Sequence, residues 1–224
     1  MATLTIPYVP NLAGALNPSF VWTNTPTGPG WFAQVRESHD GDMAAQSGRI
    51  SHSQHSDLET TLTGPGTLSF WWKVSSEEGF DRVSFKMDTP SALRAISGET
   101  DWQQVTLPIP AGAHQVSWVY AKDGSVSVGQ DAGWVDEVTF TPAAPLTLGS
   151  PRLLPDGSLA FNSTDSSGEP LLAEDLAFVE FQASTNLRDW TTLTGGCTLT
   201  NGTLILRDPD SVNLPSRFYR TVIR

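Results

Sequence analysis

Apolar and polar residues alternate along much of the chain, in short runs separated by Gly, Pro, Asp and Asn. A period of two places successive side chains on opposite faces of a strand, so each run predicts a β-strand with one buried face. Helical periodicity is nearly absent. This favours an all-β fold, an antiparallel jelly-roll sandwich of two sheets around one core. The clearest runs are Leu68–Val74, Val83–Met87, Val105–Leu107, Val116–Tyr120 and Trp134–Phe140.

A second series of strands follows a break at residues 141–145, which contain two prolines and no charge, as linkers often do. We therefore predict two domains: a jelly roll over residues 1–142 and a smaller immunoglobulin-like or fibronectin-like sandwich over residues 146–224. In the second domain Asn201-Gly202 predicts a hairpin turn, because both residue types tolerate positive φ. Its other expected strands include Phe178–Ala183 and Arg217–Ile223.

Composition narrows the class of protein. A net charge of −11 argues against nucleic acid and anionic membranes, whose phosphates need clustered Lys and Arg. The single Cys197 excludes an internal disulfide, and no apolar run approaches the roughly 20 residues of a membrane span. The first residues, Met1–Leu4, lack the basic and apolar regions of a signal peptide. We expect a cytoplasmic protein or a piece of a longer secreted chain, and prefer the second.

Several motifs in a fixed order resemble a bacterial extracellular jelly-roll module. They are Ser38–Asp42, Ala44–Gly48, Leu58–Thr61, Gly64–Glu77, Ile96–Gln103, Ile109–His114, Lys122–Ser125 and Asp131–Asp136. The module is similar to MAM domains and to cleaved-adhesin (gingipain-type) domains of concanavalin-like architecture, and the resemblance covers about residues 12–140. Three tail segments resemble the C-terminal sandwich of large secreted bacterial proteins: Ala183–Trp190, Asp208–Asp210 and Arg217–Arg220. The resemblance implies secretion or surface display, neighbouring domains, and binding rather than a known reaction. Related jelly rolls often carry structural Ca²⁺, and some bind sugars.

Catalytic motifs are missing from the sequence, which has no G-x-S-x-G, H-E-x-x-H, P-loop or G-x-G-x-x-G. A concanavalin-type glycosidase would need two carboxylates facing one cleft. Glu77 and Glu78 are adjacent in an expected loop, and Asp136 and Glu137 point to opposite faces of a strand. We therefore expect no enzyme.

Asp136 is the polar residue most in need of a partner. If Val138 and Phe140 face the core, the period of two places Asp136 on the same face, where an unpaired carboxylate is costly. One solution is Ca²⁺, bound by oxygens from loops at the end of the sandwich. The others are backbone N–H groups or an Arg. The candidate Ca²⁺ ligands are Asp40, Asp42, Glu78, Asp81, Asp131 and Asp136.

Sugar binding needs an aromatic ring on a solvent-facing sheet, with polar neighbours that bind hydroxyl groups. Trp71 shares the polar face of its strand with Ser69 and Lys73. Trp31 follows Pro29-Gly30, and Trp102 follows Asp101, so these two rings are further candidates for stacking. For each of the three, packing in the core is the alternative.

The leading hypothesis is a non-catalytic binding or adhesion module for extracellular glycans or glycoproteins, within a larger secreted or cell-surface bacterial protein. The rival is a structural spacer that displays a neighbouring domain. A solvent-exposed aromatic cluster on a sheet would favour binding, and its absence would favour the spacer.

Overall fold

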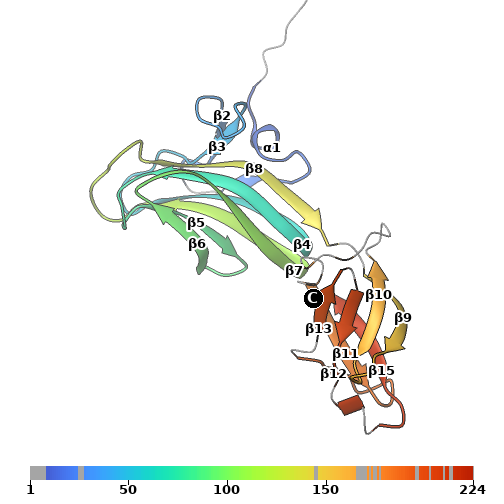
Figure 1. Ribbon diagram of the computed structural model, residues 1–224. Helices are drawn as coiled ribbons and strands as arrows, with labels where there is room; N and C mark the ends of the chain where they lie inside the picture. The colour runs from blue at the N-terminus through green and yellow to red at the C-terminus, as the bar shows by residue number, and fades with distance from the viewer. Residues whose placement is uncertain are drawn as a thin grey trace, which may run out of the picture. The chain divides into compact units, whose positions relative to one another are not determined.

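The structure is a computed structural model, and it describes residues 9–24, 28–143, 146–164, 171, 173, 176, 178–194, 197–201, 203–208, 210–211 and 214–223. The fold is an all-β arrangement of antiparallel sheets, and contacts along the chain divide it into two compact units (Figure 1). Unit 1 comprises the residues up to Thr63 together with Thr67–Thr141, and unit 2 comprises Gly64–Gly66 and the residues from Pro142 onward. The two units are described separately below.

Unit 1 is a single curled sheet whose halves pack against each other. Its strands run in the order β2-β3-β8-β4-β7-β5-β6, and β1 pairs with β4. A four-residue helix, α1 (Leu12–Ala15), precedes them. The strands are β1 (Thr23–Asn24), β2 (Phe32–Gln34), β3 (Ala44–Gln46), β4 (His55–Ser75), β5 (Arg82–Met87), β6 (Ala92–Ser97), β7 (Glu99–Ala121) and β8 (Ala132–Pro142).

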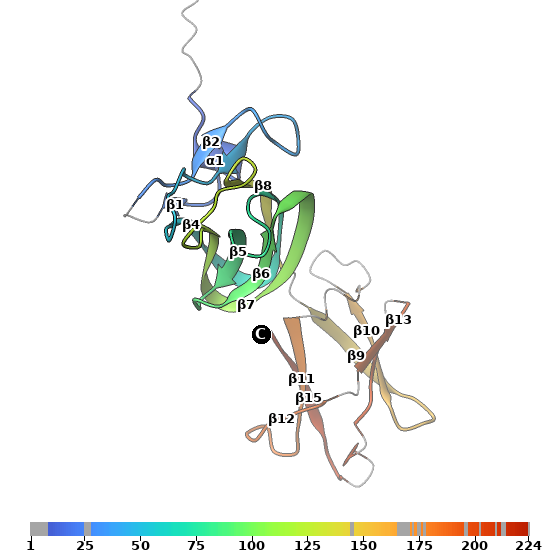
Figure 2. The same ribbon diagram turned by 90° about the vertical axis from the view of Figure 1, so that its left-hand side faces the viewer.

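The two long strands β4 and β7 make this closure possible, because each curls from one layer into the other (Figure 2). Phe70 of β4 contacts Phe85 of β5 and Trp118 of β7 across the interior, with ring centroids 5.2 and 5.1 Å apart. All three rings are fully buried. The alternation predicted for Leu68–Val74 is present: the even-numbered side chains are buried, and Ser69, Trp71 and Lys73 are partly exposed on the outer face.

One irregularity in β8 positions Asp136. Val135 and Val138 both belong to the core although they are three residues apart, so strict alternation fails between them. Glu137 adopts φ +48°, a left-handed conformation that a strand does not otherwise use. Asp136 is buried as expected, with 1% of its surface exposed, but the period of two is not the reason. The segment around His39 and Asp40 covers it.

Unit 2 contains two separate sheets, of order β13-β14-β10-β9 and β12-β11-β15. Its strands are β9 (Thr147–Leu153), β10 (Leu159–Thr164), β11 (Val179–Ser184), β12 (Thr191–Thr192), β13 (Cys197–Thr200), β14 (Thr203–Leu206) and β15 (Phe218–Ile223). Thr200 pairs with Thr203 and Asn201 adopts φ +49°, so the hairpin predicted at this position is confirmed. The immunoglobulin-like or fibronectin-like assignment stays a prediction.

Candidate ligand-binding patch and acidic cluster

Three aromatic side chains gather on the outer face of unit 1, and we call them the aromatic patch: His39, Trp71 and Trp102. The His39 ring stacks on Trp71, with centroids 3.7 Å apart and 14° between the planes. Trp102 meets the same His39 ring edge-on, at 6.1 Å and 67°. All three side chains are partly exposed. The patch therefore joins two strands, β4 and β7, to the segment between β2 and β3.

Strand geometry explains why both tryptophans face outward. Trp71 lies between Phe70 and Trp72, which are buried on the inner face of β4. Ser69 on β4 accepts a hydrogen bond from Gln104 Nε2 of β7 at 3.2 Å, which places Gln104 on the same outer face. Trp102 shares that face, because it is two residues from Gln104.

Polar groups surround the rings. Lys73 Nζ donates to Glu37 Oε1 at 2.8 Å and lies 3.5 Å from Asp101 Oδ1. His39 Nδ1 makes a short contact with a carboxylate oxygen of Glu137. The patch thus combines ring edges and faces with carboxylate and ammonium groups, the combination that binds the C–H faces and hydroxyl groups of a sugar.

Trp31 does not belong to this patch. Its side chain is 2% exposed and is part of the core of unit 1. Its indole Nε1 donates to the backbone carbonyl of Ser56 at 2.9 Å. A buried ring offers no face to a ligand, so the stacking role expected for Trp31 is wrong.

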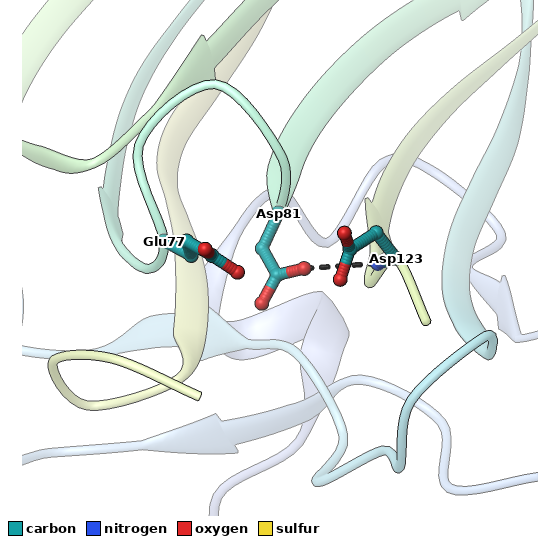
Figure 3. A group of neighbouring side chains, drawn as sticks. All are labelled: Glu77, Asp81 and Asp123. Carbon is teal, nitrogen blue, oxygen red and sulfur yellow. Dashed lines mark hydrogen bonds between the residues drawn. The ribbon is translucent and has the colours of Figure 1, made fainter. Parts of the chain in front are cut away.

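An acidic cluster lies at one end of unit 1, where Glu77, Asp81 and Asp123 turn their carboxylates toward one another (Figure 3). Ligand oxygens from all three lie within 4.8 Å of one another. Glu77 follows β4, Asp81 precedes β5 and Asp123 follows β7. Hydrogen bonds from two backbone N–H groups hold these residues together. Asp81 N–H donates to the Glu77 carbonyl at 3.1 Å, and Asp123 N–H donates to the side-chain Oδ1 of Asp81 at 2.9 Å.

Lys122 supplies a positive charge at this end. Its side chain is 1% exposed, and its Nζ lies 3.1 Å from Oδ2 of Asp81, whose side chain is fully buried. Nζ also donates to Asp131 and to Ser127 Oγ, and Tyr120 donates its phenolic proton to Asp131 at 2.8 Å. Burial acts to raise the pKa of Asp131, but the hydrogen bonds from Lys122 and Tyr120 outweigh it and lower that pKa. The carboxylate therefore stays ionised.

The donor set of the acidic cluster fits a hard cation such as Ca²⁺, which prefers carboxylate oxygens. Oε2 of Glu77 is buried and accepts no hydrogen bond from the residues that the structure describes, whereas Oδ2 of Asp81 is paired with Lys122 Nζ at 3.1 Å. The cluster does not fit a glycosidase, although three carboxylates lie close together. Asp81 is 0% exposed, so no sugar can reach it.

The six residues expected from the sequence to bind Ca²⁺ separate into groups. Asp81 and Asp131 meet through Lys122, whereas Glu78 is exposed beside them. Asp40, Asp42 and Asp136 line a different, shallow pocket near the end of α1. Asp81 shares the acidic cluster with Glu77 and Asp123, and Lys122 lies beside it. Glu77, Asp123 and Lys122 were missed as candidates, although Glu77 and Lys122-Asp123 lie in motifs quoted for the resemblance.

In the shallow pocket, backbone N–H groups already bind Asp136. Its Oδ2 accepts from His39 N–H and its Oδ1 accepts from Glu137 N–H, each at 2.7 Å. Burial raises the pKa of Asp136 to about 6, against the lowering effect of these bonds. This arrangement corresponds to the alternative without a metal.

Comparison with known proteins finds distant structural likenesses only. No protein-family model and no curated protein matches the chain. The K3 cleaved adhesin domain of Lys-gingipain from Porphyromonas gingivalis is 16% identical, over 54% of this chain and 91% of that chain, with a TM-score of 0.42. CBM51 from Clostridium perfringens GH95, solved in complex with methyl-galactose, is 21% identical over 53% and 92%, with a TM-score of 0.36.

A third similar structure is the secreted serine protease VesC from Vibrio cholerae. It is 18% identical, with a TM-score of 0.41, over 44% of this chain and 21% of the protease. The chain therefore spans less than two thirds of that protein. All three TM-scores are below 0.5, so these likenesses carry no argument about the fold or a ligand, and the functional argument depends on the side chains of this chain.

Proposed function

We propose that unit 1 is a non-catalytic glycan-binding module that binds its ligand at the aromatic patch. The observation that carries the proposal is the partly exposed cluster of His39, Trp71 and Trp102 on one face of the sheet. Sugars pack their C–H faces on aromatic rings, and their hydroxyl groups bond to charged and amide side chains beside those rings. Glu37, Lys73 and Gln104 provide such groups here.

The rival, a spacer with no ligand of its own, has no need of this arrangement. A spacer gains nothing from keeping indole surface in contact with water. The proposed setting is a larger secreted or cell-surface protein, with an extracellular glycan or glycoprotein as the partner. No helix within the described ranges has the length and apolar character needed to cross a membrane.

We expect Trp102→Ala to weaken glycan binding at least about tenfold, or roughly 1.4 kcal/mol, because the variant removes a stacking ring. Trp71→Ala should have a similar effect, since it also removes the support of His39. Affinity electrophoresis through gels that contain different polysaccharides measures the retention.

The matched control is Trp190→Ala, which removes a partly exposed tryptophan of unit 2. It should keep the full retention of the native chain. Urea unfolding of each variant shows whether the sandwich is intact. Unchanged retention of both patch variants, with folding intact, would contradict the proposal and favour the spacer.

We also propose that Ca²⁺ binds at the acidic cluster and supports this end of the sandwich. Lys122 pairs with two carboxylates, those of Asp81 and Asp131, and two more, those of Glu77 and Asp123, lie close to Asp81. This excess of negative charge supports a divalent cation, as does the buried Oε2 of Glu77, which accepts no hydrogen bond from the described residues. The ion would share Asp81 with Lys122, and the two positive charges limit its affinity.

Addition of Ca²⁺ should therefore raise the melting temperature of unit 1 by several degrees, and EDTA should reverse the change. An ion at a hundredfold excess over its Kd stabilises the folded state by about 2.7 kcal/mol. Glu77→Gln removes one ligand and leaves the Lys122–Asp81 pair in place, so its melting should not respond to Ca²⁺. Superimposable melting curves of the native chain in Ca²⁺ and in EDTA would count against the metal.

A further inference from the structure

The aromatic patch carries more negative than positive charge. Three carboxylates border it: Glu37, Asp101 and Glu137. In the described part of the chain, the one permanent cation paired with these carboxylates is Lys73, which lies 2.8 Å from Glu37 and 3.5 Å from Asp101. His39, the remaining titratable group, is already paired with Glu137. A ligand that binds here is therefore exposed to an excess of negative charge and finds no unpaired ammonium group among the described residues.

Asp101 is the most accessible of these carboxylates. Its side chain is 89% exposed, and both of its contacts, from Trp102 N–H at 2.8 Å and from Lys73 Nζ, use the same oxygen, Oδ1. Its Oδ2 thus faces solvent beside the Trp102 residue that the proposed function requires. A carboxylate next to an indole can bind an ammonium group, through an ion pair and through a cation–π contact within about 6 Å of the ring.

The charge distribution has the opposite effect on acidic glycans. A uronate or sulfate group at the patch would face Glu37, Asp101 and Glu137 across water, within a protein of net charge −11. Like charges repel, and Lys73 cannot neutralise the acidic group of the glycan because it is already paired with two carboxylates. Neutral sugars can hydrogen-bond to these groups through their hydroxyls but gain no ion pair and meet no charge repulsion.

We infer that the aromatic patch prefers amino-sugar glycans, in which free amino groups are protonated, over neutral and acidic glycans of the same length. This inference rests on the proposed function and names its ligand class. Trp102 supplies the ring, and Asp101 is the residue that determines the specificity for charge.

The test compares two oligosaccharides that differ at one substituent of each sugar: a glucosamine oligomer, with a protonated amine, and the N-acetylglucosamine oligomer of the same length, with an uncharged acetamide. Titration calorimetry at a slightly acid pH, where the amine is protonated, should show at least about tenfold tighter binding of the glucosamine oligomer. The preference should shrink as salt is added, because Asp101 is exposed and its charge is screened. An oligogalacturonate should bind more weakly than either.

Asp101→Asn should reduce the affinity for the glucosamine oligomer several-fold and leave that for the acetylated oligomer unchanged. The control is Asp189→Asn, which removes the same charge from an exposed position in unit 2. It should keep the preference, and a loss there would show that net charge alone attracts the amine. Trp102→Ala keeps the net charge, so full binding of the glucosamine oligomer by this variant would also overturn the inference.

The two proposals fail in different ways. Equal affinity of the native chain for both oligomers, lost in Trp102→Ala, would overturn the amino-sugar preference and leave glycan binding in place. Equal retention of the native chain and of both tryptophan variants on every polysaccharide would overturn the proposed function itself.

Discussion

Lys122→Met is expected to lower the free energy of unfolding of unit 1 by about 3–5 kcal/mol, the usual cost of removing one partner from a buried ion pair. The side chain of Lys122 is 1% exposed. The variant keeps its apolar stem but removes the ammonium group. Asp81, with a side chain that is 0% exposed, would lose the positive charge at 3.1 Å. Two neighbouring carboxylates, Glu77 and Asp123, would then repel it without compensation. Urea unfolding followed by tryptophan fluorescence measures the loss.

Arg94→Met is the matched control, because it removes one positive charge from an exposed position on β6. Its effect should remain within about 0.5 kcal/mol. A loss below about 1 kcal/mol for Lys122→Met would contradict the prediction and show that water screens the network. Addition of Ca²⁺ gives a second measurement. An ion bound among the same carboxylates should restore part of the stability of Lys122→Met.

Alternation along the chain predicted the Leu68–Val74 part of β4 because this part has one buried and one partly exposed face. Phe70, Trp72 and Val74 are buried where the pattern placed them, and Trp71 lies on the outer face. The continuity of the long strands was not predictable in the same way. Gly64-Pro65-Gly66 has the composition of a turn, yet β4 runs through it from His55 to Ser75. Tertiary pairing here overrides local propensity.

The site was less predictable, because it depends on which strand ends meet. Arg82 of β5 pairs with Ala121 of β7, and this register brings the residue before β5 next to the two residues after β7. Asp81 therefore meets Lys122 and Asp123. The sequence shows the charges but not the register, so Lys122 could not be chosen over other basic residues. The stacking of His39 on Trp71 likewise depends on the path of a loop between β2 and β3.

Asp136→Ala should lower the free energy of unfolding by about 2–4 kcal/mol at neutral pH. The change removes an acceptor with 1% exposure, which leaves the backbone N–H groups of His39 and Glu137 without their 2.7 Å bonds. Each charge-assisted bond contributes about 1.5–3 kcal/mol, and the cost of removing the ionised carboxylate from water offsets part of the sum. Asp42→Ala, an exposed change at the same pocket, should be close to neutral. An unchanged free energy of unfolding in Asp136→Ala would show that these two hydrogen bonds do not stabilise the fold.

The pH dependence of stability separates the two ways in which Asp136 can be held. Burial raises its folded pKa to about 6, above its ordinary value of 3.8, so the folded state takes up the proton more readily. The extra stability that comes from this proton uptake is present below about pH 4 and is lost as the pH rises through 6, which leaves the contribution of the two N–H bonds. The free energy of unfolding of the native chain minus that of Asp136→Ala should therefore fall as the pH rises from about 4 to 6. A cation bound by Asp40, Asp42 and Asp136 would lower the pKa of Asp136 instead. The difference in the free energy of unfolding would then rise with pH, and such a rise would show an ionised carboxylate paired with a metal.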